Sequence, residues 1–343
     1  MKRYLGRHKR EYLEINVLDA ARERVRHIFN TFDTVVVCFS GGKDSLVVMN
    51  LIKEMGVLPV NVVFRDEELI PKQVIDFVDQ YRQQPWVNML WFAVPLRSSK
   101  YVLGRVSEYV QWDPKRPHLR EAPEWAIQST QVYDQHSLDE FIASYFRGKV
   151  ALCTGIRASE SLTRYRACVA KLNENYITKS SSPRAMLCKP IYDWSENDVF
   201  KYLAENNISY CDLYDLQHSG GDRLRVSTPL HSESAKRIGL LREVNAPFYD
   251  QVLGLFPEME VQDRYYKEFD REALFEKHGK TFSKIEAWIN EHVDIRVRHM
   301  AMRRMFHMRK LHEREPTKYT MKDIFRYFYG GDYLKERPMR ERQ

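Results

Sequence analysis

Cysteine is scarce in this chain of 343 residues, and its five cysteines follow no paired spacing. An odd number of cysteines without a CxxC pair argues against a disulfide framework or a zinc site and favours a reducing compartment. No apolar run approaches the ~20 residues that a helix needs to cross a bilayer. The opening residues, MKRYLGRHKREYLE, contain no apolar segment of the kind found in a signal peptide. We therefore expect a cytoplasmic protein that does not bind a membrane.

The chain is long and carries a net positive charge. Its 343 residues can form one large α/β domain and a smaller appendage. Hydrophobic residues make up 43% of the sequence, which is enough for a sizeable core and excludes global disorder. The formal net charge of +7 indicates anionic partners, either nucleotides or nucleic acid.

A strand, a glycine turn and a helix follow one another from residue 34. The run TVVVCF at 34–39 predicts a buried strand, and LVVMNLIKEM at 46–55 has the length and apolar spacing of a helix. Between them stands SGGKDS. This order directs free backbone N–H groups and a helix dipole toward one point, which suits a phosphate. The loop is not the Walker pattern GxxxxGK[ST], because its glycines and lysine are spaced differently.

Every residue of this loop is therefore a candidate ligand of a nucleotide. Lys43 adds a positive charge, and two serines add hydroxyl donors. The predicted binding residues are Ser40, Gly41, Gly42, Lys43, Asp44 and Ser45.

Polar residues follow two further expected strands. Asp66 lies just after the strand at 59–64, and Arg157 follows the strand at 150–155. In an open α/β sheet, ligands bind at the carboxyl ends of the strands. We expect Asp66 to hold Mg²⁺ or a ribose hydroxyl, although an acidic first turn of the helix at 71–83 also explains it. We expect Arg157 to bind an anion, because it precedes any helix that could pair it.

Two other arginines are weaker candidates for the same site. Arg164 stands four residues after Glu160, so a helical salt bridge is its alternative explanation. Arg225 lies in DRLRVSTPL after two glycines, and it either points at a phosphate or is simply solvated.

The regular succession of expected strands and helices is interrupted at residues 104–146, and we expect an ordered loop insertion there. Trp112, Arg116, Arg120 and Trp125 either form a substrate wall or belong to a surface excursion pinned by buried tryptophans.

From residue 235 onward helical patterns dominate. We therefore expect a nucleotide-binding domain at 1–234 and a basic helical region at 235–343.

Positive charge is dense near the C-terminus. Residues 294–314 contain seven Arg or Lys residues and only two acidic ones, with methionines interleaved. The favoured interpretation is a surface helix with a Met-rich core face. The alternative is a surface that binds nucleic acid weakly or contacts an acidic partner.

SGGKDS resembles the SGGxDS signature of the PP-loop superfamily, which includes ATP pyrophosphatases and PAPS reductases. GIRASES at 155–161 resembles the GIRxxES segment of PAPS reductases, whose arginine contacts the anionic groups of the substrate. PIYDWSENDVFKYLAENNISYCDLYD at 190–215 resembles another segment of that family. The resemblance covers about Asp33 to Asp215. It implies a mostly parallel sheet with flanking helices, of the adenine nucleotide alpha-hydrolase-like type.

The chain also departs from the sulfonucleotide reductases. Those enzymes carry a catalytic cysteine on a C-terminal tail, whereas the last cysteine here is Cys211. Paired cysteines for an iron–sulfur cluster are missing too, so none is expected. WDPKRP, EAPEW and LRVSTPL instead resemble a prophage-linked branch described as gene co-activators, often paired with a ParB-like protein.

The resemblance implies an ATP-using enzyme that cleaves between the α and β phosphates and activates an unidentified acceptor, for which a nucleic-acid base is one candidate. Lys43, Asp44 and Arg157 are the predicted catalytic residues, and Asp44 and Asp66 the predicted ligands of Mg²⁺. Two alternatives stay open. One is a PAPS or APS reductase-like enzyme, and the other is a non-catalytic nucleotide-sensing regulator acting with a ParB-like partner.

Overall fold

The computed structural model describes residues 14–103, 105–160, 164–165, 168, 175–180, 182–219, 226–265, 274–329 and 333. Contacts within the chain divide these residues into two compact units. One unit contains the described residues up to Asp263, and the other contains those from Arg264 onward.

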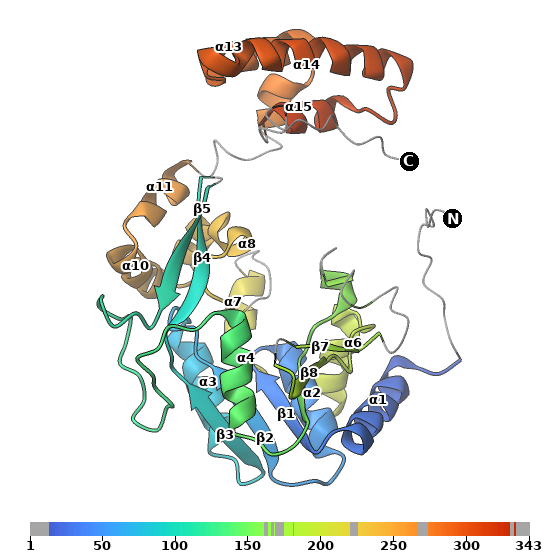
Figure 1. The fold of residues 1–343 in the computed structure, drawn as a ribbon, viewed down its shortest axis with the longest axis vertical. Coiled ribbons are helices and arrows are strands. Elements are labelled where there is room, and N and C mark those ends of the chain that lie inside the picture. Colours follow the sequence, from blue (N-terminus) through green and yellow to red (C-terminus); the bar gives the residue numbers. More distant parts are fainter. Residues whose placement is uncertain are drawn as a thin grey trace. The chain divides into compact units, whose positions relative to one another are not determined.

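A six-stranded sheet forms the centre of the first unit, with the strand order β3-β2-β1-β6-β8-β7 (Figure 1). The edge strand β7 is antiparallel to β8, and all other pairs are parallel. The strands are β1 (Thr34–Phe39), β2 (Val60–Arg65), β3 (Val87–Phe92), β6 (Val150–Cys153), β7 (Ile177–Lys179) and β8 (Ala185–Cys188). The expected fold class, a mostly parallel α/β sheet with flanking helices, is confirmed.

Helices cover both faces of this sheet (Figure 1). The side chains of β1 alternate between two cores, with Val35 and Val37 in one and Val36 in the other. A continuous apolar strand is what burial on both faces requires. The first core also takes in α1 (Val17–Thr31), α2 (Lys43–Lys53), α3 (Lys72–Arg82) and α6 (Glu196–Glu205). The second is closed by α4 (Gln135–Ser144) through Leu138 and Ile142.

The strand order reverses direction at β1. The chain runs outward from β1 through β2 to β3, then returns to place β6 on the other side of β1. Because the connections on the two sides diverge there, a crevice opens outside the carboxyl ends of β1 and β6. This is the position at which doubly wound sheets bind ligands.

After β3, the alternation of strands and helices along the chain is interrupted by a hairpin of β4 (Leu96–Val102) and β5 (Arg105–Gln111). Later helices pack on this hairpin, and the rings of Tyr109 and Phe256 lie 5.4 Å apart. Between Cys153 and the second unit the structure also has η1 (Ala158–Glu160), α7 (Leu213–Ser219), α8 (Ser232–Ala235), α9 (Ile238–Val244), α10 (Ala246–Leu255) and α11 (Glu258–Tyr265). The described residues after 235 form helices and connecting segments without a strand, in line with the sequence pattern.

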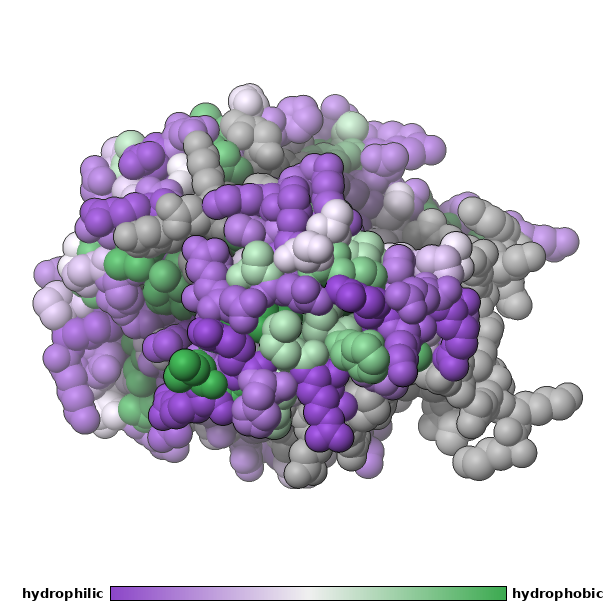
Figure 2. All heavy atoms as spheres, turned by 90° about the horizontal axis from the view of Figure 1, so that it is seen from above, coloured by the Kyte–Doolittle hydropathy of each residue, from purple (hydrophilic) through white to green (hydrophobic). Residues whose placement is uncertain are grey.

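The second unit is helical. It contains η2 (Phe275–Gly279), α13 (Phe282–His292), α14 (Ile295–Arg314) and α15 (Met321–Tyr329). Its core includes Trp288, Met305, Met308, Phe325 and Phe328. Figure 2 shows one face of the molecule, on which hydrophilic side chains surround a small group of apolar ones. Within the described ranges, every helix is too short or too polar to cross a membrane.

Candidate functional site

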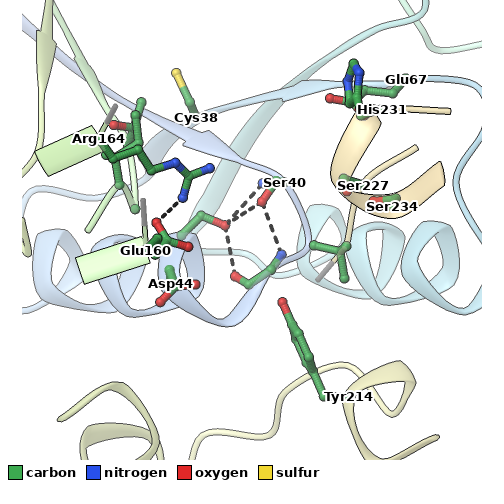
Figure 3. Close-up of a pocket in the computed structure, with 16 residues that line it drawn as sticks. Cys38, Ser40, Asp44, Glu67, Glu160, Arg164, Tyr214, Ser227, His231 and Ser234 are labelled. Atoms are coloured by element: carbon green, nitrogen blue, oxygen red, sulfur yellow. Dashed lines mark hydrogen bonds and ion pairs between the residues drawn. The ribbon is translucent and has the colours of Figure 1, made fainter. Parts of the chain in front are cut away.

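A cavity of about 440 Å³ lies at the crevice between β1 and β6. Residues from the end of β1 and the following loop line it, together with Thr154, Gly155 and Ile156 after β6. In Figure 3, Asp44, Glu160 and Arg164 lie at one end of this pocket, and Glu67 and His231 lie at the other. The remaining lining residues are Cys38, Ser40, Gly42, Ser45, Tyr214, Val226, Ser227 and Ser234.

The glycine loop has the geometry of an anion site. Gly41 has φ of +75°, and a Cβ atom added to it would lie 2.7 Å from Val74 Cγ1, so this position requires glycine. Gly42 is the N-cap of α2 and has no side chain with which to cap it. The first turn of α2 therefore directs amides without intrahelical acceptors toward the pocket.

Two serine hydroxyls close the loop. Ser45 Oγ donates to the carbonyl of Gly42 at 2.9 Å and accepts from the amide of Ser40 at 3.2 Å. The hydroxyl oxygens of Ser40 and Ser45 lie 3.1 Å apart. Of the predicted loop residues, Ser40, Gly42, Asp44 and Ser45 line the pocket, whereas Gly41 and Lys43 do not.

Gly155 lets β6 approach this loop closely. A Cβ atom there would lie 2.5 Å from the amide nitrogen of Ser45 and 2.5 Å from the carbonyl carbon of Asp44. Any larger residue would push the end of β6 away from the start of α2. The glycine of GIRASES therefore shapes the pocket wall.

Lys43 points under the loop and does not line the pocket. Its side chain is 2% exposed, and its Nζ lies 3.3 Å from Asp44 Oδ2 and 3.2 Å from Glu196 Oε1. The amide of Lys43 donates to the hydroxyl oxygen of Tyr214 at 3.1 Å. Burial raises the pKa of Tyr214, so this phenol keeps its proton and can donate it to a ligand in the pocket.

Arg157 is likewise held by carboxylates. Its Nε donates to Asp44 Oδ1 at 2.6 Å, and its Nη2 lies 3.8 Å from Glu160 Oε1. Arg164, which pairs with Glu160, is the arginine whose side chain reaches the pocket among the described residues. The predicted binding residue Arg225 lies outside the described residues.

Asp66 is buried beside the pocket and does not line it. Its Oδ2 accepts from Trp91 Nε1 at 2.9 Å, and its Oδ1 accepts from the amide of Glu68 at 2.9 Å and from Arg120. Because donors occupy both oxygens, we assign Asp66 to the support of the loop that follows β5. Its neighbour Glu67 is the acidic residue after β2 that faces the pocket.

Glu68 anchors the same loop. Its two oxygens accept from Arg116 at 2.7 and 2.6 Å, and Oε2 also accepts from the amide of Trp112 at 2.6 Å. Trp112 is buried, whereas Trp125 is 54% exposed. Arg116 is therefore engaged by a carboxylate, so the contacts favour a pinned excursion over a cationic substrate wall.

Glu67 and His231 form the end of the pocket away from Arg164 (Figure 3). Burial raises the pKa of Glu67, and the nearby imidazole of His231 and the amide of Thr228 partly oppose this shift. Sequence reasoning missed both residues, because they are far apart in the chain. It also missed Tyr214, whose signal lay in the segment at 190–215.

Two carboxylates line the same end of the pocket as Arg164. In the described part of the chain, no group of three or more His, Cys, Asp or Glu side chains is arranged to hold a metal ion. Asp44 and Glu160 both line the pocket, with side chains 17% exposed. Mg²⁺ often uses only one or two carboxylates and takes its other ligands from phosphates and water. Asp44 is paired with Lys43 and Arg157, and Glu160 is paired with Arg164, so an ion bound here would share these oxygens with the protein's own cations.

The cysteines are all free thiols. Cys38 lines the pocket, and burial raises its pKa to about 11. Cys153 and Cys188 stand opposite each other on β6 and β8, and the hydrogen bond between them raises the pKa of Cys153. Neither shift favours the thiolate that a cysteine nucleophile needs.

Comparison with known proteins gives the family. The YbdN protein of Escherichia coli K12, whose function is uncharacterized, is 30% identical over 236 residues, and the match covers 62% of this chain and 58% of that protein. The adenosine 5'-phosphosulfate reductase of Staphylococcus haemolyticus is 22% identical over 223 residues, covering 64% and 81%. The phosphate complex of Candida auris phosphoadenylyl-sulfate reductase is 17% identical, with a TM-score of 0.36, covering 61% and 87%. The family model for the phosphoadenosine phosphosulfate reductase domain matches residues 34–239, more than half of the chain. The chain therefore belongs to the phosphoadenosine phosphosulfate reductase domain family.

Proposed function

We propose that this chain is a PP-loop enzyme that binds ATP in the pocket between β1 and β6 and cleaves it between the α and β phosphates. The observation that carries this proposal is the uncapped start of α2, which opens into that pocket beside the hydroxyls of Ser40 and Ser45. An anion at this point would meet the first turn of the helix, the hydroxyl of Ser40 and the positive end of a helix dipole.

The charges around the pocket support a nucleotide that arrives with a cation. The three cations Lys43, Arg157 and Arg164 are matched by the three carboxylates Asp44, Glu160 and Glu196. The phosphates of ATP would therefore add uncompensated negative charge. Mg²⁺ held by Asp44 and Glu160 would offset that charge and polarise the phosphoryl oxygens.

The chain's own residues would stabilise the departing pyrophosphate. The start of α2, the hydroxyls of Ser40 and Ser45, the Tyr214 phenol and Arg164 all line the pocket. The buried pairs beneath the loop keep these donors in place before the substrate binds. Preorganised donors of this kind are the main source of catalysis in phosphoryl transfer, where a protein nucleophile is not required.

The other end of the pocket would receive the acceptor. Glu67 has a raised pKa and lies near His231, so this pair is suited to take a proton from an attacking hydroxyl or amine. The acceptor itself stays open between a nucleic-acid base and a small metabolite.

The two alternatives carry different expectations. A sulfonucleotide reductase needs a reactive thiolate, and the pocket cysteine Cys38 has a raised pKa instead. A regulator that senses nucleotide with a ParB-like partner would bind ATP without turning it over. The free thiols suit the reducing cytoplasm that we expect as the compartment.

Incubation with ATP labelled at the α phosphate tests the proposal. With Mg²⁺, and with or without oligonucleotides, the protein should form AMP and pyrophosphate. Ser45→Ala should reduce this product strongly, whereas Ser144→Ala at the end of α4 should not. Formation of ADP would contradict cleavage at the α–β bond, and sulfite release from PAPS would favour the reductase.

A further inference from the structure

The outward face of α14 carries four positive side chains in one row. Arg296, Arg303 and Lys310 recur every seven residues, and Arg314 follows after four more, so all four lie on one side of the helix. At 1.5 Å per residue the row is roughly 27 Å long. The opposite side of the helix is buried in the core of the second unit through Ala301, Met305 and Met308.

These four side chains are exposed and weakly engaged. Among the described residues, Arg303 and Lys310 form no ion pair with a carboxylate. Within the described ranges, Arg296 and Arg314 pair with carboxylates next to the helix ends, and their side chains remain 85% and 60% exposed. Exposed pairs of this kind contribute little free energy, so another anion can replace the carboxylate.

Two other cations of the helix are already committed to the fold. Arg309 donates to Glu286 of α13 at 2.7 Å and covers the ring of Phe282. Arg298 donates to the backbone carbonyl of Val293. The number of cations available to a partner is therefore smaller than the seven in the sequence.

An aromatic ring lies within the row. Phe306 is 62% exposed, and the ammonium of Lys310 lies 4.6 Å from the centre of its ring. An exposed ring flanked by cations offers a base a surface to stack on while the cations contact the adjacent phosphates. A duplex hides the faces of its bases, and an acidic peptide has no base to stack.

We propose that this face of α14 binds single-stranded nucleic acid, with the four cations on the phosphates and Phe306 against a base. Each neutralised phosphate releases counterions, and a single strand loses about 0.7 units of log affinity per contact for each tenfold rise in salt. Four contacts predict an affinity loss on the order of 50-fold between 50 and 200 mM salt.

Fluorescence anisotropy with the full chain tests this proposal. The probes are a labelled 20-nucleotide oligo(dT), a 20-base-pair duplex and a labelled polyglutamate peptide. Binding to the single strand should be tightest and should show the stated salt dependence. Arg303→Glu with Lys310→Glu should abolish it. The matched control is Lys72→Glu with Lys201→Glu, which makes the same charge change at exposed lysines of the first unit and should bind as the wild type does.

Phe306→Ala separates stacking from simple charge. It should weaken oligo(dT) binding about tenfold and leave duplex binding unchanged. No binding to oligo(dT) at 50 mM salt, equal loss in both charge-reversal variants, or a preference for polyglutamate would each overturn the proposal. If the reversed variant fails to fold by circular dichroism, Arg303→Gln with Lys310→Gln should still weaken binding more than the same change at Lys72 and Lys201.

Discussion

Arg157 Nε donates to Asp44 Oδ1 at 2.6 Å and so joins the carboxyl end of β6 to the first turn of α2. Both side chains are largely shielded from water, at 5% and 17% exposed. The pair spans the crevice at which the strand order reverses. It therefore fixes the distance between the two walls of the nucleotide pocket.

Breaking this pair should destabilise the fold. Arg157→Met removes the shorter of the two ion pairs that the described residues form with Asp44 and leaves the one with Lys43, and loss of one partner of a buried pair costs about 3–5 kcal/mol. Urea unfolding measures the change. Lys72→Met, which removes one partner of an exposed helical pair with Asp76, should cost no more than about 0.5 kcal/mol. Similar losses in the two variants would mean that the Arg157 pair is not structurally important.

Lys43 should affect nucleotide binding through charge balance. Its Nζ lies between Asp44 and Glu196 and does not line the pocket. Lys43→Met should therefore weaken ATP binding by about 1.5–3 kcal/mol, because the carboxylates below the phosphates lose their counter-charge. The double variant Lys43→Met with Glu196→Gln restores the balance and should recover most of the affinity. Calorimetric titration decides: a double variant as weak as the single one would mean that Lys43 contacts the phosphate directly.

Glu68 should hold the loop after β5 in place. It is fully buried, and it accepts from Arg116 and from the amide of Trp112. Glu68→Ala should cost about 3–5 kcal/mol, since it leaves the guanidinium without its partner. Released from this anchor, the loop should be cut faster by trypsin after Lys115. Glu121→Ala, at an exposed residue of the same loop, is the control, and equal cleavage rates would contradict the anchoring role.

The parts of this molecule that depend on local pattern could be predicted from the sequence. The strand at Thr34–Phe39 is found at the predicted residues, and the glycine loop lies in the pocket. The capping box of Ser195 and Asp198 opens α6, and the spacing of these two residues is visible in the sequence. Each of these features depends on residues that are near one another in the chain, so spacing alone reveals it.

The parts that depend on distant partners could not be predicted. Lys43 turns away from the pocket because Glu196 receives it, and Arg157 is drawn to Asp44 rather than to solvent. The strand Ile177–Lys179 has no visible signal in the sequence, since three residues at a sheet edge are too short to show a period.

The last prediction concerns the pH dependence of stability at Glu67. Burial raises the pKa of this carboxyl above its ordinary value, so the folded chain holds the proton more tightly than the unfolded chain does. The stability that this provides is present below the ordinary pKa and is lost as the pH rises through the raised one. Glu67→Gln keeps an acceptor for the Thr228 amide but cannot ionise. Urea unfolding between pH 4 and 8 should show this variant gaining stability relative to the wild type as the pH rises.

Asp134 provides a control of opposite sign. It caps α4, and its hydrogen bonds from Ser137 lower its pKa, so its stability contribution is present above the ordinary pKa and is lost as the pH falls. Asp134→Asn, which retains a capping oxygen, should therefore gain relative stability toward low pH. His231 lies near Glu67, so Glu67→Gln should also be measured in a His231→Gln background to remove the influence of that imidazole on the carboxyl. A Glu67→Gln curve parallel to that of the wild type in both backgrounds would show that Glu67 is solvated like a surface carboxylate, and it would remove the basis for assigning it as the base at the acceptor end of the pocket.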